Sequence, residues 1–351
     1  AVARDQLKTE NMKRRLLRHK FALWVIAALA LASCSQDELA DGGQGTPLPP
    51  GEYPLTLTAS SIGETVATPA TRGTVDNEWD GTEYVCVQVY DNYTSGEPQW
   101  SNATEQEYKV TKDGTMTKTS GNDVYWQTSG EKKAIRACFV AQDPYDPVPP
   151  PSSHAVNADQ SWNSEYYKSD LLYAGCISGF AEGKDGINLT FYHQVAKLTI
   201  QIVRGKDTPA VFSVTGLKIN RVATKGDFTA PATFVDDDDS RYGRWSNTTE
   251  VKDITPHETT ADYPDNSGIL AAYEAIVIPQ TVKANTKLFT ITAEGYSDFA
   301  YTTTAEKEWE PGKEYTYTIT IKGDRLEVSV SGGNIGWGTD GATGSGEVEL
   351  P

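Results

Sequence analysis

The chain has 351 residues, and its 31 basic and 48 acidic side chains give a formal net charge of −17 at pH 7. A chain with this much negative charge repels phosphate backbones, so nucleic acid is an unexpected partner. The same charge favours solubility. The length suffices for two domains with hydrophobic cores, and a composition with 18 Tyr but only two Met is typical of a β-protein.

The N-terminal residues have the pattern of an export signal. Met12 is the first residue that fits a translation start, and residues 13–20 form a basic region. Residues 21–31 are an almost unbroken apolar run, too short for a membrane-spanning helix of about 20 residues but suited to a signal peptide. We therefore assign residues 1–33 to upstream sequence and a cleaved signal. They hold seven basic and two acidic residues, so the remaining chain has 24 basic and 46 acidic residues, a formal charge of −22.

The apolar run ends in Leu31-Ala32-Ser33-Cys34, which resembles the bacterial lipobox. In a lipobox the peptidase cuts before the cysteine, whose thiol carries diacylglycerol and whose amine is acylated. Several acyl chains anchor a protein stably to a membrane, so Cys34 is the expected lipidation site and residues 34–50 the tether. The acidic residues that follow are similar to the tag that sends lipoproteins of Bacteroides-type bacteria to the outer surface. The alternative is an ordinary signal peptide followed by a solvated tether.

Residues 53–60 alternate in polarity. Tyr53, Leu55, Leu57 and Ala59 share one face of an extended chain, and proline or hydroxyl residues occupy the other. This pattern predicts a strand with one buried face. The residues from 61 to 73 have the composition of a surface loop.

Further strands are predicted by short alternating or apolar runs between Gly- and Pro-rich turns. They cover residues 84–90, 106–111, 123–126, 134–141, 170–177, 187–203 (one or two strands), 211–222, 228–234, 274–278, 288–293, 299–304, 315–321 and 326–330. No long 3.6-residue apolar repeat follows the signal. The sequence therefore predicts an all-β protein with two sandwich domains, residues 51–195 and 196–351.

Motifs that would carry catalysis or bind a cofactor are not recognised. Cys86, Cys138 and Cys176 are an odd number, which favours buried free thiols over a disulfide framework. The four histidines lack metal-ligand spacing, and the acidic run 236–239 lacks the spacing of a calcium loop and is interpreted as a solvated loop. No phosphate loop, nucleophile elbow or glycosidase pair is present. We expect no enzyme activity, no cofactor and no metal site.

Several short motifs follow one another in a recognisable order. They are Ala70-Thr71-Arg72-Gly73, Trp79-Asp80-Gly81, LTFYHQVAKL at 189–198, IVIPQ at 276–280, PGKEY at 311–315 and IGW at 335–337. Together they span nearly all of the chain after Cys34. In this order they resemble the fimbrillin-like family of Bacteroides-type bacteria.

This resemblance implies two transthyretin-like β-sandwich domains and a role as a subunit of a fimbria, or pilus. It implies that the lipoprotein reaches the outer membrane, where a trypsin-like, arginine-specific protease cuts between Arg72 and Gly73. Residues 51–72 would then be a removable strand and loop, with Tyr53, Leu55, Leu57 and Ala59 as its plug side chains. The freed groove would accept a donor strand from a neighbouring subunit of the fimbria at the cell surface.

The C-terminal residues depart from the family's pattern. A stalk subunit should offer a long alternating donor strand, whereas residues 338–346 are rich in glycine and the last residues offer only Val348 and Leu350 as apolar side chains. This favours a tip, accessory or anchor subunit that adheres to a host or bacterial surface receptor. The alternative is a surface glycan-binding lipoprotein that never polymerises. Its tryptophans either form sugar platforms or pack in the core: Trp100, Trp126, Trp162, Trp245 and Trp309.

Overall fold

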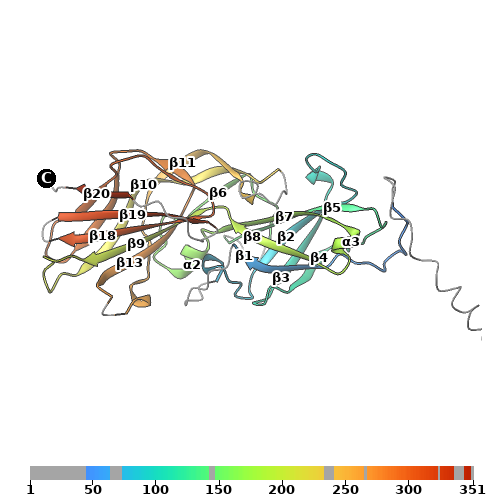
Figure 1. The fold of residues 1–351 in the computed structure, drawn as a ribbon, viewed down its shortest axis with the longest axis horizontal. Coiled ribbons are helices and arrows are strands. Elements are labelled where there is room, and N and C mark those ends of the chain that lie inside the picture. The colour runs from blue at the N-terminus through green and yellow to red at the C-terminus, as the bar shows by residue number, and fades with distance from the viewer. Residues whose placement is uncertain are drawn as a thin grey trace, which may run out of the picture. The chain divides into compact units, whose positions relative to one another are not determined.

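In the part of the chain that the structure, a computed structural model, describes, the regular elements are strands joined by loops and a few short helical turns (Figure 1). The structure describes residues 45–63, 73–141, 147–232, 241–264, 267–322, 325–335 and 344–348. Cys34, Arg72 and the acidic run 236–239 lie outside the described residues. The all-β class predicted from the sequence is confirmed.

The N-terminal strands form one seven-stranded sheet in the order β1-β8-β7-β5-β2-β3-β4 (Figure 1). Its members are β1 (Leu57–Ile62), β2 (Tyr84–Tyr90), β3 (Thr104–Val110), β4 (Met116–Gly121), β5 (Lys132–Val140), β7 (Leu171–Gly179) and β8 (Ile187–His193). Neighbours pair antiparallel, except β1 and β8, which run parallel. The strands β2 and β5 are buried along nearly their whole length, as expected for strands in the middle of a sheet.

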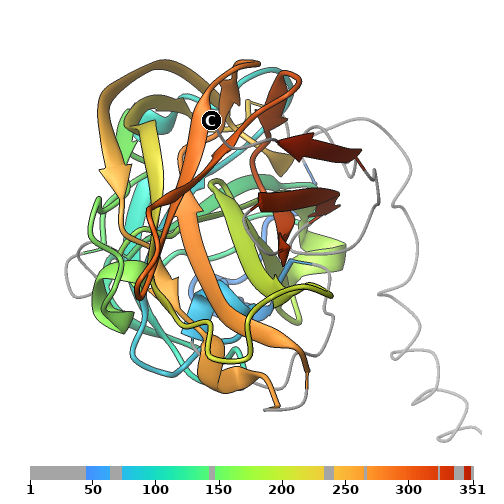
Figure 2. The same cartoon turned by 90° about the vertical axis from the view of Figure 1, so that its left-hand side faces the viewer.

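Three further sheets follow along the chain (Figure 2). One has the order β11-β10-β15-β16 with β6 also paired to β10, the second has the order β12-β13-β9-β18-β19-β20, and β14 pairs with β17. The bounds are β6 (Ser153–Ala155), β9 (Ala196–Arg204), β10 (Val214–Thr229), β11 (Arg244–Ile254), β12 (His257–Glu258), β13 (Ile269–Val277), β14 (Gln280–Val282), β15 (Lys287–Ala293), β16 (Phe299–Thr302), β17 (Lys307–Trp309), β18 (Lys313–Lys322), β19 (Arg325–Ile335) and β20 (Gly344–Val348).

The helical elements are single turns. They are η1 (Gly73–Asp76), η2 (Trp100–Asn102), α2 (Asn163–Tyr167), α3 (Phe180–Gly183) and η4 (Thr260–Asp262). Within the part of the chain that the structure describes, no helix has the length and apolar character needed to cross a membrane.

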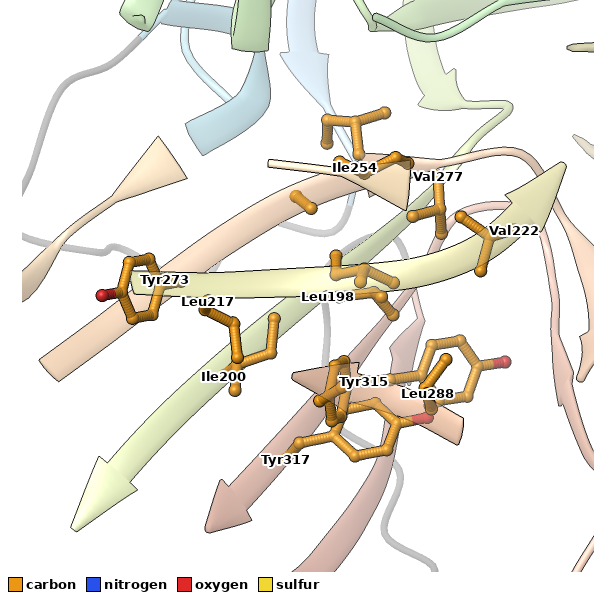
Figure 3. Close-up of a cluster of buried hydrophobic side chains, with 14 of the residues drawn as sticks. Leu198, Ile200, Leu217, Val222, Ile254, Tyr273, Val277, Leu288, Tyr315 and Tyr317 are labelled. Carbon is orange, nitrogen blue, oxygen red and sulfur yellow. The ribbon is translucent and has the colours of Figure 1, made fainter. Parts of the chain in front are cut away.

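Buried side chains gather in two hydrophobic clusters. The first cluster is formed by the seven-stranded sheet and the chain just before it, and includes Leu57, Trp79 and Phe191. The second is formed mainly by strands of the later sheets, where Leu198 of β9 pairs with Tyr315 of the neighbouring strand β18 (Figure 3). Both clusters belong to one compact unit that begins at Thr46. The predicted domain boundary between residues 195 and 196 stays a prediction.

The first strand is shifted relative to its prediction. The sequence predicts a strand over residues 53–60, whereas β1 spans Leu57–Ile62. Pro54 explains the late start, because it has no N–H to donate to a continuous ladder. Accordingly it makes only an isolated bridge, with Tyr125.

Other differences between the predicted and the observed strands occur where the strands are polar. The strands β4 and β11 are exposed along most of their length, so neither an apolar run nor a clear alternation marks them in the sequence. The 16-residue strand β10 covers most of the strand predicted over residues 211–222 and continues through residues 223–227, but it includes only the first two residues of the strand predicted over 228–234. Residues 233 and 234 lie outside the described residues. The polar middle of β10 stays in the sheet because it pairs with β11 on one side. The residues 123–126, predicted as a strand, contribute only an isolated bridge.

Candidate functional site

Residues 46–63, here called the closing segment, form the first edge of the seven-stranded sheet. On this flank β1 runs parallel to β8 (Figure 1). The amide of Ile187 donates a hydrogen bond to the carbonyl of Thr56 at 2.9 Å, and the amide of Gly63 donates to the carbonyl of Phe191 at 2.7 Å. The closing segment therefore bonds to the sheet at both ends of β1.

The opposite flank of the closing segment contacts residues 114–128, which include β4, the last strand of the same sheet. The amide of Ala59 donates to the carbonyl of Gly114 at 2.8 Å, and the amide of Leu55 donates to the carbonyl of Val124 at 2.8 Å. Further backbone bonds on this flank are Trp126 to Tyr53 at 2.9 Å and Leu48 to Gln127 at 2.8 Å. The closing segment thus bonds to β8 on one flank, and on the other to residues that lie just before and just after β4.

Side chains of the closing segment fill part of the first cluster. Leu55, Leu57 and Ile62 are buried there, and burial of one such side chain contributes about 1.5–3 kcal/mol. Three of them contribute roughly 4–9 kcal/mol by the same rule, an upper bound because unfolded chains already bury some surface. A whole domain is stable by only about 5–15 kcal/mol. Much of the stability around the first cluster therefore depends on this segment.

The sequence predicts Tyr53, Leu55, Leu57 and Ala59 as plug residues, and the structure brings all four to the first cluster. Tyr53 is half-buried, and its ring meets Phe180 edge-on with centroids 5.2 Å apart. The predicted cut site, Arg72, lies outside the described residues.

Ile62 is a buried residue of this segment that sequence reasoning missed. Simple alternation from Leu57 and Ala59 would place residue 62 on the exposed face. However, the register of β1 on β8 shifts between Thr58 and Ser61, and such a bulge reverses the faces that follow it. The shift buries Ile62 completely. Its signal in the sequence is only that an isoleucine ends a polar run.

Trp79 contacts the closing segment near its middle. Its indole Nε1 donates to the carbonyl of Ala59 at 2.9 Å, inside the first cluster. The indole ring meets Phe139 and Phe191 edge-on, with centroids 6.2 Å and 5.1 Å apart. The sequence marks Trp79 as part of a motif, but spacing alone does not reveal its contact with Ala59.

The residues that follow Gly73 are held by buried polar contacts. The hydroxyl of Thr74 donates to the carboxylate of Asp170 at 2.8 Å, and Nδ1 of His193 lies 2.9 Å from the same carboxylate. The other ring nitrogen of His193 lies 3.0 Å from Oδ1 of Asn77. Burial raises the pKa of Asp170, but the charge of His193 and the hydrogen bonds to the carboxylate outweigh it, so this pKa lies below its ordinary value.

A second buried contact links the same stretch to the later strands. Nζ of Lys197 lies 3.7 Å from Asp76 and 3.3 Å from Glu274, and the hydroxyl of Tyr166 donates to Glu274 at 2.8 Å. Val75 is wholly buried in the second cluster. Residues 74–79 therefore reach from the second cluster, at Val75, to the first, at Trp79. Sequence reasoning predicted none of these pairs, because their partners are far apart in the chain.

The tryptophans considered as sugar platforms fall into different environments. Trp126 and Trp309 are buried in the two clusters, and the Nε1 of Trp245 donates to the carbonyl of Gln194 at 2.7 Å. The guanidinium of Arg136 lies over Trp100, with its central carbon 4.2 Å from the centroid of the indole ring. Of the five, Trp162 is the one that is largely exposed, at 72%.

The three later cysteines are free thiols, and Cys86 and Cys138 are buried. Burial raises the pKa of Cys86 and of Cys176 to about 12, so both stay protonated at neutral pH and are poor nucleophiles. Among the described side chains, no three His, Cys, Asp or Glu residues gather as a metal site requires.

Comparison with known proteins identifies a family and a shared fold. A family model described as fimbrillin-like matches residues 71–336. The solved structure of a proposed cell adhesion protein from Bacteroides uniformis is 19% identical, with a TM-score of 0.51, over 80% of this chain and 98% of that one. A second, from Bacteroides ovatus, is 13% identical with the same TM-score over 85% and 99% of the two chains. At these identities the likeness is one of fold alone. No curated protein sequence matches the chain.

Proposed function

The chain belongs to the fimbrillin-like family, and from this premise we propose that it is a fimbrial subunit that assembles by exchanging its closing segment for a strand of another subunit. Its role is structural and adhesive. The proposal is supported above all by the closing segment, which bonds to β8 on one flank and to residues on either side of β4 on the other, fills part of the first cluster, and lies just before the predicted cut at Arg72.

The proposed sequence of events begins with a lipoprotein acylated at Cys34 and held at the outer membrane. An arginine-specific protease cuts between Arg72 and Gly73. The cut turns an intramolecular contact into a contact between two chains, which lose the high effective concentration of a tether. The segment can then leave, and the exposed edges accept a strand from a neighbouring subunit by β-augmentation.

The same proposal includes the finer expectations from the sequence. The subunit has two transthyretin-like domains and takes a tip or accessory position. Its partners are other fimbrial subunits, the protease and a surface receptor or glycan.

The test is N-terminal sequencing of the protein taken from the cell surface, alongside its lipidated precursor. We expect the surface form to begin at Gly73. Replacing Arg72 with lysine should block an arginine-specific cut and leave the precursor length, whereas Arg244→Lys, at an exposed arginine, should be processed normally. A surface form that begins at acylated Cys34 would contradict assembly by strand exchange.

The exposed indole of Trp162 supports a second candidate function, glycan binding by an uncut lipoprotein. In that case the surface form would keep its closing segment, and Trp162→Ala would abolish glycan binding measured by calorimetry. Trp100→Ala is the matched control, because Trp100 is covered by Arg136.

A further inference from the structure

Trp79 is one of the residues that the closing segment touches and that the cut would leave in place. We propose that Trp79 determines which strand the groove accepts, by requiring a small side chain and an available backbone carbonyl at the position now held by Ala59. The inference rests on the proposed function, because it concerns the strand that replaces the closing segment.

Trp79 keeps its position independently of the covalent link to the closing segment. It lies on the far side of the predicted cut, and the residues before it are fixed by contacts elsewhere in the protein. Asn77 contacts His193 at 3.0 Å, and Val75 is buried in the second cluster. The indole therefore remains as a fixed wall of the groove after the segment leaves.

The indole N–H selects a carbonyl. Ala59 uses both of its backbone groups in the groove, since its N–H donates to Gly114 at 2.8 Å and its carbonyl accepts from Trp79 at 2.9 Å. An indole nitrogen can only donate, and a buried donor without an acceptor is costly. An incoming strand must place a carbonyl at this point, which fixes its register, and a slip of one residue would also turn its apolar side chains outward.

The surroundings of Ala59 select a small side chain. Ala59 is 0% exposed, whereas the neighbouring buried positions hold leucine side chains at Leu55 and Leu57. Trp79 is itself 5% exposed and is braced by Phe139 and Phe191, so it has little room to retreat. Enlarging a fully buried side chain in such a setting forces strain. The partner strand should therefore read large-x-Leu-x-Leu-x-small, with Ala, Gly or Ser at the last position.

The test uses the full chain cut in vitro at Arg72, with a fluorescent peptide of residues 46–63 offered in excess to displace the closing segment. A peptide carrying Ala59→Leu should bind at least about tenfold more weakly than the native peptide. The peptide with Thr56→Leu is the matched control, because Thr56 faces solvent, and should bind within about threefold of the native one. Equal binding by the Ala59→Leu peptide would overturn the size requirement.

A separate measurement tests whether the incoming strand needs a backbone carbonyl at the position of Ala59. Trp79→Phe keeps an aromatic ring but loses the donor, and should weaken the native peptide by about tenfold. Trp309→Phe is the control, because Trp309 is equally buried and its Nε1 donates to Tyr317 at 3.1 Å, but in the second cluster. A peptide with a thioamide in place of the Ala59 carbonyl tests the same contact in the unchanged protein.

The outcomes separate this inference from the proposed function. Undiminished affinity in both the Trp79→Phe protein and the thioamide peptide would overturn the role of Trp79 while strand exchange stands. A cut wild-type chain that takes up no native peptide would overturn strand exchange itself, and the inference with it.

Discussion

Asp170 shows how a buried charge is kept in this fold. Its carboxylate has no exposed surface, yet it contacts His193 and Thr74 and accepts the amide of Leu171 at 2.9 Å. Because this pKa is lowered in the folded state, the ionised carboxylate stabilises the fold at pH values above the ordinary aspartate pKa of about 3.9. This contribution is lost as the pH falls through the folded-state pKa.

We therefore expect Asp170→Asn to lower the free energy of unfolding at pH 7 and to flatten its decline below about pH 4. Urea unfolding measured from neutral pH to about pH 2 checks this expectation. Asp185→Asn serves as the control, because the side chain of Asp185 is 82% exposed. If the free energy of unfolding of Asp170→Asn fell as steeply below about pH 4 as that of the wild type, Asp170 would not contribute to the decline.

A second residue-scale prediction concerns the closing segment. Leu57→Ala should lower the free energy of unfolding by about 2–5 kcal/mol, because it removes a buried side chain and leaves a cavity. Thr56→Ala changes the preceding residue, on the exposed face, and should cost no more than about 0.5 kcal/mol. Urea unfolding of the uncut chain measures both, and similar losses for the two variants would contradict the observed faces of the closing segment.

At the scale of elements, the turn before β18 depends on a glycine. Gly312 has φ of 71°, and a Cβ there would lie 2.2 Å from the ring of Tyr242. Gly295 has a similar φ of 77° but open space around it. Both Gly→Ala variants carry the cost of the left-handed backbone, so their difference isolates the clash with Tyr242.

We expect Gly312→Ala to lower the melting temperature clearly more than Gly295→Ala, with a difference of at least about 1 kcal/mol in the free energy of unfolding. Gly312→Ala combined with Tyr242→Ala should recover part of this difference. A double variant as unstable as the single one would place the cost in the backbone instead.

Elements also show what the sequence could and could not predict. Strands such as β2 and β18 were predicted nearly to their ends, because their buried positions form clear apolar runs or alternation. The polar strand β11 left no such signal, and it is held in the sheet by backbone pairing with β10. The bulge that buries Ile62 is likewise a property of pairing with β8, and a single strand does not encode it.

At the scale of the molecule, the burial of side chains in the closing segment was predictable from the sequence, and the residues that surround them were not. Alternation identified Leu55 and Leu57, because burial on one face imposes a period of two on the sequence. Trp79 meets Ala59 from 20 residues away, and Thr74 meets Asp170 from 96 residues away. Such contacts depend on how the whole chain is folded, and one sequence carries no record of them.

The acidic charge of the chain opposes association between subunits. Residues 34–351 carry a formal charge of −22, so like charge opposes the approach of two subunits, and salt weakens this repulsion within a Debye length of about 10 Å at 0.1 M. Chains cut at Arg72 should therefore associate faster at about 150 mM salt than at about 10 mM, measured by light scattering. The uncut chain should stay monomeric at both concentrations. A rate that falls with salt would indicate attraction between oppositely charged surfaces instead.

The bonding of the closing segment on two flanks has a consequence for timing. A cut at Arg72 would break one peptide bond and none of the contacts with β8 or residues 114–128. The nicked subunit would stay intact until those contacts open, so its lifetime is set by a rate and not by an equilibrium. An incoming strand can shorten that lifetime by forming each bond as the old one is lost, beginning at a frayed end. A cleaved subunit would thus keep its closing segment for some time after the cut. This interval would allow it to reach a growing fibre before its unpaired strand edges are exposed.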